Sequence, residues 1–266
     1  MSVSLQCPIC DGATEHFGNA QVLGSYQAEY RRCVSCEAVF AANPTWLSEA
    51  YKHPIAESDI GLIGRNIRSA RITRRVLRRL FRNAESFLDF GAGTGMFVRL
   101  MRDAGFPFRY CDAYGPNLFA KGFETDITTG ARFDFATAFE VLEHLRRPAD
   151  ALSPLAFSSD AVFATTFVLP TPPPRLDAWW YYSLSSGQHV TFYTERSLDV
   201  LADRLGYRRF SAGEFHLFSH RTVPNRTLRL LVSERFRRVV KRRLQRRSLL
   251  PDDYESLTGK KLSDSE

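Results

Sequence analysis

The sequence lacks any long run of apolar residues. No stretch among its 266 residues approaches the roughly 20 that a membrane-spanning helix needs. The opening residues, MSVSLQCPICDG, also lack the basic and then apolar pattern of a secretory signal. Together these absences argue against a membrane-embedded or secreted chain, and we expect a cytoplasmic protein.

Cysteine is scarce, and its placement is uneven. Four of the five cysteines form two C-x-x-C pairs, Cys7 with Cys10 and Cys33 with Cys36. Such pairs are typical of a tetrahedral structural zinc site, because each pair directs two thiolates at one ion. Four thiolate ligands would leave no position open for catalysis. The alternative is four incidental thiols.

Acidic residues are missing from two segments. Residues 65–82 and 235–247 each carry eight Lys or Arg and no Asp or Glu, so the formal charge of +7 is concentrated there. Both segments belong to expected amphipathic helices, one over 65–81 and one beginning near Asn225. The apolar stripe of the second helix comprises Leu228, Leu231, Val232, Phe236, Val239, Val240 and Leu244. The first helix either has a solvated basic face or contacts a nucleic acid or phosphate. The second either packs on its own domain or lies on an anionic membrane surface, and the two basic segments together could also hold RNA.

Strand and helix signals alternate from residue 86 onward. Strands are expected at 86–90, 108–111, 133–139 and 161–168, with helices at 95–104, 143–157 and 194–205. Two short strands should follow at 207–211 and 215–219. This alternation predicts an α/β fold with a doubly wound, mostly parallel sheet and helices on both faces. The polar segment from Pro251 is expected to be loose.

Three glycines lie within five positions of "LDFGAGTGMF", between an expected strand and an expected helix. Gly91, Gly93 and Gly95 let the main chain approach a ligand, and the helix N-terminus directs N–H groups at it. The spacing is G-x-G-x-G and differs from the G-x-G-x-x-G of dinucleotide-binding folds. Asp89 precedes this loop, and Asp112 ends the next strand, where a carboxylate can accept from ribose hydroxyls.

These motifs, in this order, resemble those of the class I methyltransferases that use S-adenosylmethionine (SAM). "LDFGAGTG", "RYCDAYG" and "FDFATAFEVLEHL" resemble the first motif, the second-strand acid and the fourth-strand region of that family. The resemblance implies a seven-stranded Rossmann-like sheet. It also implies cofactor contacts from Asp89, Gly91, Ala92, Gly93, Gly95, Asp112 and Asp126. Glu140 would lie along the cofactor or acceptor side of the cleft.

A finer resemblance concerns the cysteine region. "RCVSCEAVFAANPTWLSEAY" is similar to the second zinc knuckle and exit segment of bacterial methyltransferases associated with sugar and polysaccharide modification. Glu37 stands where those proteins commonly have glycine. We therefore expect a zinc ribbon over residues 1–45, a methyltransferase domain over 46–222, and a basic helix with a polar tail over 223–266.

The acceptor should be selected by the segment after the fifth strand. Trp179, Trp180, Tyr181 and Tyr182 offer flat faces that suit the C–H side of a sugar ring, although they could equally be core or lid packing. His189 lies in "GQHVTFYTERSL", which resembles an element of small-molecule methyltransferases. Histidine titrates near neutrality and can serve as a base for a hydroxyl acceptor.

His189, His144 and Glu140 are therefore the catalytic candidates, with a purely structural role as the alternative for each histidine. A metal-assisted reaction has no support from the sequence, because outside the ribbon no acids and histidines show ligand spacing. The leading hypothesis is O-methylation of a sugar in a glycan, glycolipid or nucleotide-sugar precursor. The alternatives are an RNA methyltransferase, an inactive SAM-binding scaffold and, less favoured, a nicotinamide dehydrogenase.

Overall fold

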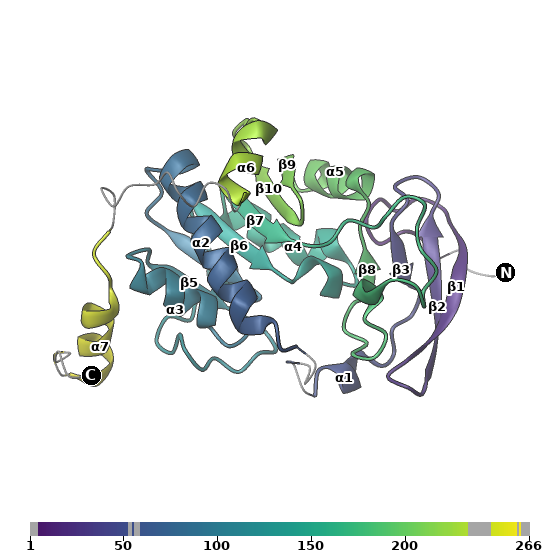
Figure 1. The fold of residues 1–266 in the computed structure, drawn as a ribbon, viewed down its shortest axis with the longest axis horizontal. Coiled ribbons are helices and arrows are strands. Elements are labelled where there is room, and N and C mark those ends of the chain that lie inside the picture. The colour runs from purple at the N-terminus through teal and green to yellow at the C-terminus, as the bar shows by residue number, and fades with distance from the viewer. Residues whose placement is uncertain (1–4, 53–54, 56–58, 234–245, 260, 262–266) are drawn as a thin grey trace.

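The structure, a computed structural model, describes residues 5–52, 55, 59–233, 246–259 and 261. Two sheets dominate it, a large one carrying the helices and a smaller one formed mainly by the N-terminal strands (Figure 1). The large sheet has six strands in the order β5 (Phe108–Cys111), β4 (Phe87–Phe90), β6 (Phe135–Phe139), β7 (Ala161–Thr165), β10 (Phe215–Ser219) and β9 (Arg208–Ala212).

Four of these strands, β5, β4, β6 and β7, run parallel, and β10 is antiparallel to both its neighbours. The doubly wound α/β prediction is confirmed, but among the described residues the sheet has six strands and not the predicted seven. In the described chain a single parallel bridge between Tyr110 and Glu124 stands beyond β5. Gly122 turns the chain before this bridge with φ +85°, and a 3₁₀ turn, η1 (Ile127–Thr129), follows at once, so no strand can extend.

Helices cover both faces of the large sheet. Alternate strand residues such as Phe87 and Leu88 belong to different cores, as the two-residue period of a strand requires. Phe87 packs with α2 (Leu62–Leu80), α3 (Met96–Asp103) and α6 (Asn225–Val232). Leu88 packs on the other side with η2 (Leu142–His144), α4 (Pro148–Ser158) and α5 (Glu195–Arg204).

The smaller sheet combines residues from distant parts of the chain. Its order is β1 (Thr14–Val22), β2 (Tyr26–Cys33), β3 (Val39–Ala41) and β8 (Thr191–Phe192). The fourth strand thus comes from within the predicted methyltransferase domain. A core including Trp46, Tyr181 and Phe192 fills the space beside this sheet, next to α1 (Leu47–Ala50) and η3 (Trp180–Tyr182). The boundary at residue 45 remains a prediction, but the two parts share a sheet.

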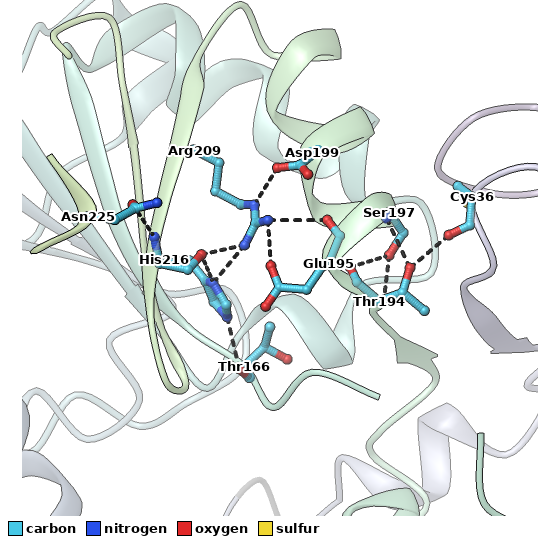
Figure 2. A network of polar contacts seen from close by, with 10 residues as sticks. Cys36, Thr166, Thr194, Glu195, Ser197, Asp199, Arg209, His216 and Asn225 are labelled. Carbon is cyan, nitrogen blue, oxygen red and sulfur yellow. Dashed lines mark hydrogen bonds and ion pairs between the residues drawn. The ribbon is translucent and has the colours of Figure 1, made fainter. Parts of the chain in front are cut away.

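A polar network also connects the two parts (Figure 2). Thr194 caps α5 as expected, accepting from the Ser197 N–H at 3.0 Å, and its hydroxyl donates to the Cys36 carbonyl at 2.8 Å. Arg209 of β9 pairs with Glu195 and Asp199 of the same helix at 2.6 and 2.8 Å. The cap therefore joins the second cysteine pair to a helix that is itself held to the large sheet.

The C-terminal segment is not loose throughout. Residues 250–258 form α7 (Leu250–Thr258), and its buried Asp253 pairs with Arg102 at 2.6 Å and with Arg99 at 2.9 Å. The expectation of a loose segment from Pro251 is therefore wrong for residues 251–258, because a buried ion pair attaches them to α3.

Of the second predicted basic helix, which begins near Asn225, the structure describes only α6. The apolar stripe residues from Phe236 onward lie outside the described residues. Arg75 of α2 donates to the carbonyls of Leu231 and Ser233 at 3.1 and 3.2 Å, so at least this arginine attaches α2 to the end of α6. Among the described helices, none is both long and apolar enough to cross a membrane.

Candidate active site

A cleft of about 1930 Å³ opens at the carboxyl ends of the parallel strands. The glycine loop after β4, the turn after β5 and the segments after β6 and β7 all line it, as expected for a doubly wound sheet. Nearly every residue predicted to bind cofactor or to act in catalysis faces this cleft. They are Asp89, Gly91, Ala92, Gly93, Asp112, Asp126, Glu140, His144 and His189. Gly95, the N-cap residue of α3, belongs to the same loop but does not line the cleft.

All three glycines of the loop have positive φ, but Gly91 and Gly93 are needed for different purposes. A Cβ on Gly91 would lie 2.4 Å from Val141 Cγ2, so packing requires glycine at this position. A Cβ on Gly93, at φ +52°, would meet no atom within 4 Å. The backbone at Gly93 therefore borders open space in the cleft, where a bound molecule could lie directly against it.

Asp112 is held in place by the main chain. Its Oδ2 accepts from the Gly93 N–H at 2.8 Å, and its Oδ1 accepts from the N–H groups of Tyr114 and Gly115 at 2.7 and 2.5 Å. A carboxylate has about four acceptor sites, so one remains for a ligand. Asp126 lies further along the cleft, where its carboxylate caps η1 by accepting from the Thr128 N–H at 2.8 Å.

Asp89 lies beneath the loop and is buried. The Thr137 hydroxyl donates to its Oδ1 at 2.6 Å. Burial raises the pKa of Asp89 to about 7, although the Thr137 hydrogen bond opposes the shift.

Two histidines and a glutamate meet on the opposite side of the cleft. The rings of His144 and His189 are 4.9 Å apart, and ligand atoms of Glu143, His144 and His189 all lie within 4.8 Å of one another. The expectation that no acids and histidines outside the ribbon gather at ligand distance is therefore wrong. Glu143 and His144 belong to η2, while the chain brings His189 from 45 residues further on through the segment that leads into β8.

Glu140 is held beside this cluster by unusual backbone geometry. Its φ is +53°, a region that costs a residue with a side chain about 1–3 kcal/mol. The Thr165 hydroxyl accepts from the Glu140 N–H at 2.9 Å and donates to Glu140 Oε1 at 2.8 Å. Arg65 approaches Glu140 Oε2 at 3.6 Å. This end of β6 is therefore fixed in a strained conformation, which is common at functional sites.

The electrostatics of the cluster favour uncharged side chains. Burial raises the pKa of Glu140 to about 7, with the charge of Glu143 adding to the effect, and burial raises the pKa of Glu143 to about 7. Burial lowers the pKa of His144 to about 3 and also lowers that of His189. Both imidazoles are therefore neutral near pH 7.

His189 has a defined tautomer. Its Nδ1 lies 2.8 Å from the Tyr181 carbonyl, which can only accept, so Nδ1 carries the proton. Nε2 is left with a free electron pair. His144 is held through Nδ1 by the Tyr51 hydroxyl at 2.9 Å.

The predicted aromatic wall is only half correct. Trp180 and Tyr181 line the cleft, with Trp180 70% exposed and the Tyr181 ring 4.6 Å from the His189 ring. Trp179 and Tyr182 pack instead with Phe192 of β8, with ring centroids 6.2 and 4.7 Å from it. The 3₁₀ turn η3 separates the four rings between two faces, which accounts for the difference.

Four further residues of the cleft were not anticipated. Phe167, Tyr51, Arg65 and Glu143 contribute to it or to its cluster. The sequence could have indicated two of them. Glu143 follows Glu140 by three residues in "EVLEH", and Phe167 lies two residues beyond the end of β7, where cleft residues are expected.

The four predicted metal ligands come together at one end of the smaller sheet. The Cys7 and Cys36 sulfurs are 3.6 Å apart and those of Cys10 and Cys33 are 3.4 Å apart. All four lie within 4.8 Å of one another. Tetrahedral Zn–S bonds of about 2.3 Å imply sulfur separations of roughly 3.8 Å, so this group has the dimensions of a four-thiolate metal site.

Comparison with known proteins identifies the catalytic family. A family model described as a methyltransferase domain matches residues 65–211. The chain belongs to this methyltransferase family. The glycine loop, Asp112 and both histidines of the cleft lie in the matched region, while residues outside it, such as Tyr51 and Phe215, also line the cleft. The chain is a SAM-dependent methyltransferase with the class I fold. The nicotinamide dehydrogenase hypothesis is wrong.

Several solved methyltransferase structures resemble this methyltransferase at low identity. The N-terminal domain of EvdMO1 with SAH bound is 17% identical over 55% of this chain and 78% of that one, with a TM-score of 0.39. Mitomycin 7-O-methyltransferase MmcR is 16% identical over 66% and 60% of the two chains, with a TM-score of 0.43. Human N-acetylserotonin methyltransferase in complex with SAM is 14% identical over 66% of each chain, with a TM-score of 0.41. No curated protein matches the chain.

Proposed function

We propose that this methyltransferase acts on a hydroxyl group of a sugar, in a glycan, a glycolipid or a nucleotide-sugar precursor. The observation that carries the proposal is the pairing, in one cleft, of the unprotonated Nε2 of His189 with the exposed ring of Trp180. A base and an aromatic face are what a sugar hydroxyl and a sugar ring require of a site.

The residues of the cleft fit SAM. We propose that the glycine loop, with Gly93 open to the cleft, lies against its methionine part, that Asp112 accepts from the ribose and that Asp126 lies beside the adenine. Bound SAM supplies a methyl group on a sulfonium, which an oxygen nucleophile can displace in line. The chain then has mainly to align the acceptor and to remove its proton.

His189 can take that proton at Nε2. The Tyr181 carbonyl at 2.8 Å fixes the ring, and the lowered pKa keeps it unprotonated near pH 7. Beside it, Glu140 and Arg65 offer polar groups for neighbouring sugar hydroxyls. Phe167 stands 5.3 Å from Trp180 in an edge-on arrangement, so the two rings support each other at the mouth of the cleft.

We also propose that the four cysteines hold a structural zinc ion. The sulfur separations support it, and so do the N–H groups of Ile9 and Cys36, which donate to the sulfurs of Cys7 and Cys33 at 3.4 and 3.3 Å. Arg204 of α5 reaches the Ile9 carbonyl at 2.6 Å and Asp11 at 2.8 Å, so the first cysteine pair is attached to the same helix as the second.

The test of the function is transfer of labelled methyl from SAM into an extract of the source cells, followed by separation into RNA, lipid-linked glycan, sugar-nucleotide and protein fractions. Label in a glycan or sugar-nucleotide fraction is expected. Label in RNA alone would replace the proposal with an RNA methyltransferase.

The Asp112→Asn variant tests the cofactor assignment. Losing a hydrogen bond to a charged acceptor costs about 1.5–3 kcal/mol, so the SAM dissociation constant measured by calorimetry should rise roughly 10- to 100-fold. Asp177→Asn, at an exposed position, is the matched control and should bind SAM normally. Wild-type affinity in the Asp112 variant would refute the role of Asp112.

A further inference from the structure

The cluster of Glu143, His144 and His189 contains a buried carboxylate that is poorly supplied with hydrogen bonds. Glu143 is 0% exposed, and within the described part of the chain neither of its side-chain oxygens has a donor at hydrogen-bond distance. The hydroxyls of Thr166 and Tyr181 lie close enough to oppose the rise in the pKa of Glu143, but they bond to each other at 3.2 Å. A buried acid left in this state is costly, and a folded protein normally supplies such a group with a partner.

We propose that these three side chains form a binding site for a divalent metal ion, separate from the four-cysteine site. Their ligand atoms lie within 4.8 Å of one another, a spread that one ion can bridge with small side-chain rotations. The ion would provide a counter-charge in direct contact with Glu143, whereas Arg65 acts on this carboxylate only from a distance.

The surroundings of the two histidines are those of metal ligands. His189 donates from Nδ1 to a backbone carbonyl, an arrangement that orients an imidazole so that Nε2 can bind an ion. His144 is held by the Tyr51 hydroxyl at Nδ1 and by the backbone of Gln188, so it would exchange one of these contacts for the ion. The nearby cation Arg65 is occupied, since it pairs with Asp59 at 2.6 Å and lies 3.6 Å from Glu140.

The ligand set indicates which ions fit. Two imidazoles and one carboxylate suit first-row ions such as Mn²⁺, Fe²⁺, Co²⁺ or Zn²⁺ better than Ca²⁺ or Mg²⁺, which prefer oxygen ligands. Three protein ligands also leave coordination positions open, and His144 and His189 both face the cleft.

The open positions suit an oxygen of the acceptor, and this part of the inference rests on the proposed function. An ion there would take the electron pair of His189 Nε2, so this imidazole would then act as a ligand in place of a base. The ion would position the acceptor through one or two of its oxygens and would lower the pKa of a bound hydroxyl, whose proton would pass to water in the open cleft. Acceptors with neighbouring oxygens, as sugars have, would then be favoured over isolated hydroxyls.

The experiment measures binding of Mn²⁺ to the full-length, zinc-loaded protein by electron paramagnetic resonance, in which free and bound Mn²⁺ are distinguished. Mn²⁺ prefers oxygen and nitrogen ligands to thiolates, so the cysteine site does not interfere. We expect near-stoichiometric binding by the wild type. Glu143→Gln and His189→Gln should weaken it at least about tenfold, while His16→Gln, an exposed histidine on β1, should bind as the wild type does.

SAM affinity, measured for each variant, distinguishes loss of the ion from loss of the fold. Retained SAM binding with lost Mn²⁺ binding supports the site. Failure of the wild type to bind Mn²⁺ at about 1 mM, or equal binding by Glu143→Gln, overturns it. Since Mn²⁺ binding needs no acceptor, bound Mn²⁺ without label in any fraction would refute the proposed function alone, and sugar labelling without Mn²⁺ binding would refute the ion site alone.

Discussion

The cysteine group and the Glu143 cluster are built in opposite ways. The first brings four cysteines together from two short loops, with three of them buried and Cys10 half-buried. The second takes three ligands of two kinds from segments 45 residues apart, and its histidines face a large cleft. A closed group can only support structure, whereas an open one leaves room for a reactant. The two proposals therefore assign a stabilising role to the cysteine group and a reactive role to the Glu143 cluster.

The largest expected effect is on folding stability and should follow from removing one thiol of the cysteine group. Cys33→Ser removes one thiolate, and because binding of a structural zinc ion is coupled to folding, we expect a loss of at least about 5 kcal/mol in the free energy of unfolding. Denaturant titration and zinc content measured by mass spectrometry check this. Cys111→Ser, outside the group, should retain its zinc. An unchanged zinc content in Cys33→Ser would show that the cysteines do not hold the ion.

The second effect concerns a buried acid that, unlike Glu143, has a donor at hydrogen-bond distance. The pKa of Asp89 is raised by burial from 3.8 to about 7, so its ionisation disfavours the folded state increasingly as pH rises across that range. Asp89→Asn removes this penalty. Its free energy of unfolding relative to the wild type should therefore increase by about 4 kcal/mol between pH 3 and pH 8.

Asp134→Asn is the matched control with the opposite sign. Partial burial acts to raise the pKa of Asp134, but hydrogen bonds from the N–H groups of Glu85 and Ser86 prevail and lower it. Its stabilisation is present at neutral pH and lost in acid, so this variant should be most destabilised near pH 7. Parallel pH profiles for the two variants would contradict the interpretation of Asp89.

A third effect tests the open group through its activity. His189→Gln should lower the rate of methyl transfer by roughly 100-fold or more, whether the imidazole serves as a base or as a ligand. SAM affinity should stay within about twofold of wild type, since none of the proposed cofactor contacts is changed. Transfer rates of His16→Gln provide the reference. A rate close to wild type in His189→Gln would leave this histidine a purely structural role.

The smallest effect lies in the loop after the second cysteine pair. Glu37 has φ +62°, a conformation that glycine adopts without strain. This explains why similar proteins commonly have glycine at this position, and it means that Glu37 is locally strained. Glu37→Gly relieves the strain but loses an ion pair with Arg32 at 3.2 Å and adds unfolded-state entropy. A net gain of about 0.5–1 kcal/mol is expected, visible as a higher melting temperature. A lower melting temperature would show that the ion pair outweighs the strain.

The sequence was most informative where neighbouring residues act together. The cysteine pairs, the glycine loop and the Thr194 cap depend on residues a few positions apart, and the structure places each as expected. The meeting of Glu143 with His189 depends on how two distant segments pack, which no local pattern encodes. The position of α7 was likewise hidden, because it depends on the ion pairs of Asp253 with α3.

The two-residue strand β8 helps to position His189 in the cleft. Thr191 and Phe192 pair with Phe40 and Val39, and the Val190 carbonyl accepts from the Ala41 N–H at 2.9 Å. A slip of one residue along β3 would turn successive side chains to the opposite face. His189, next to this pairing, would then leave the cleft. The pairing register between β3, which follows the second cysteine pair, and β8 therefore determines whether His189 lies in the cleft.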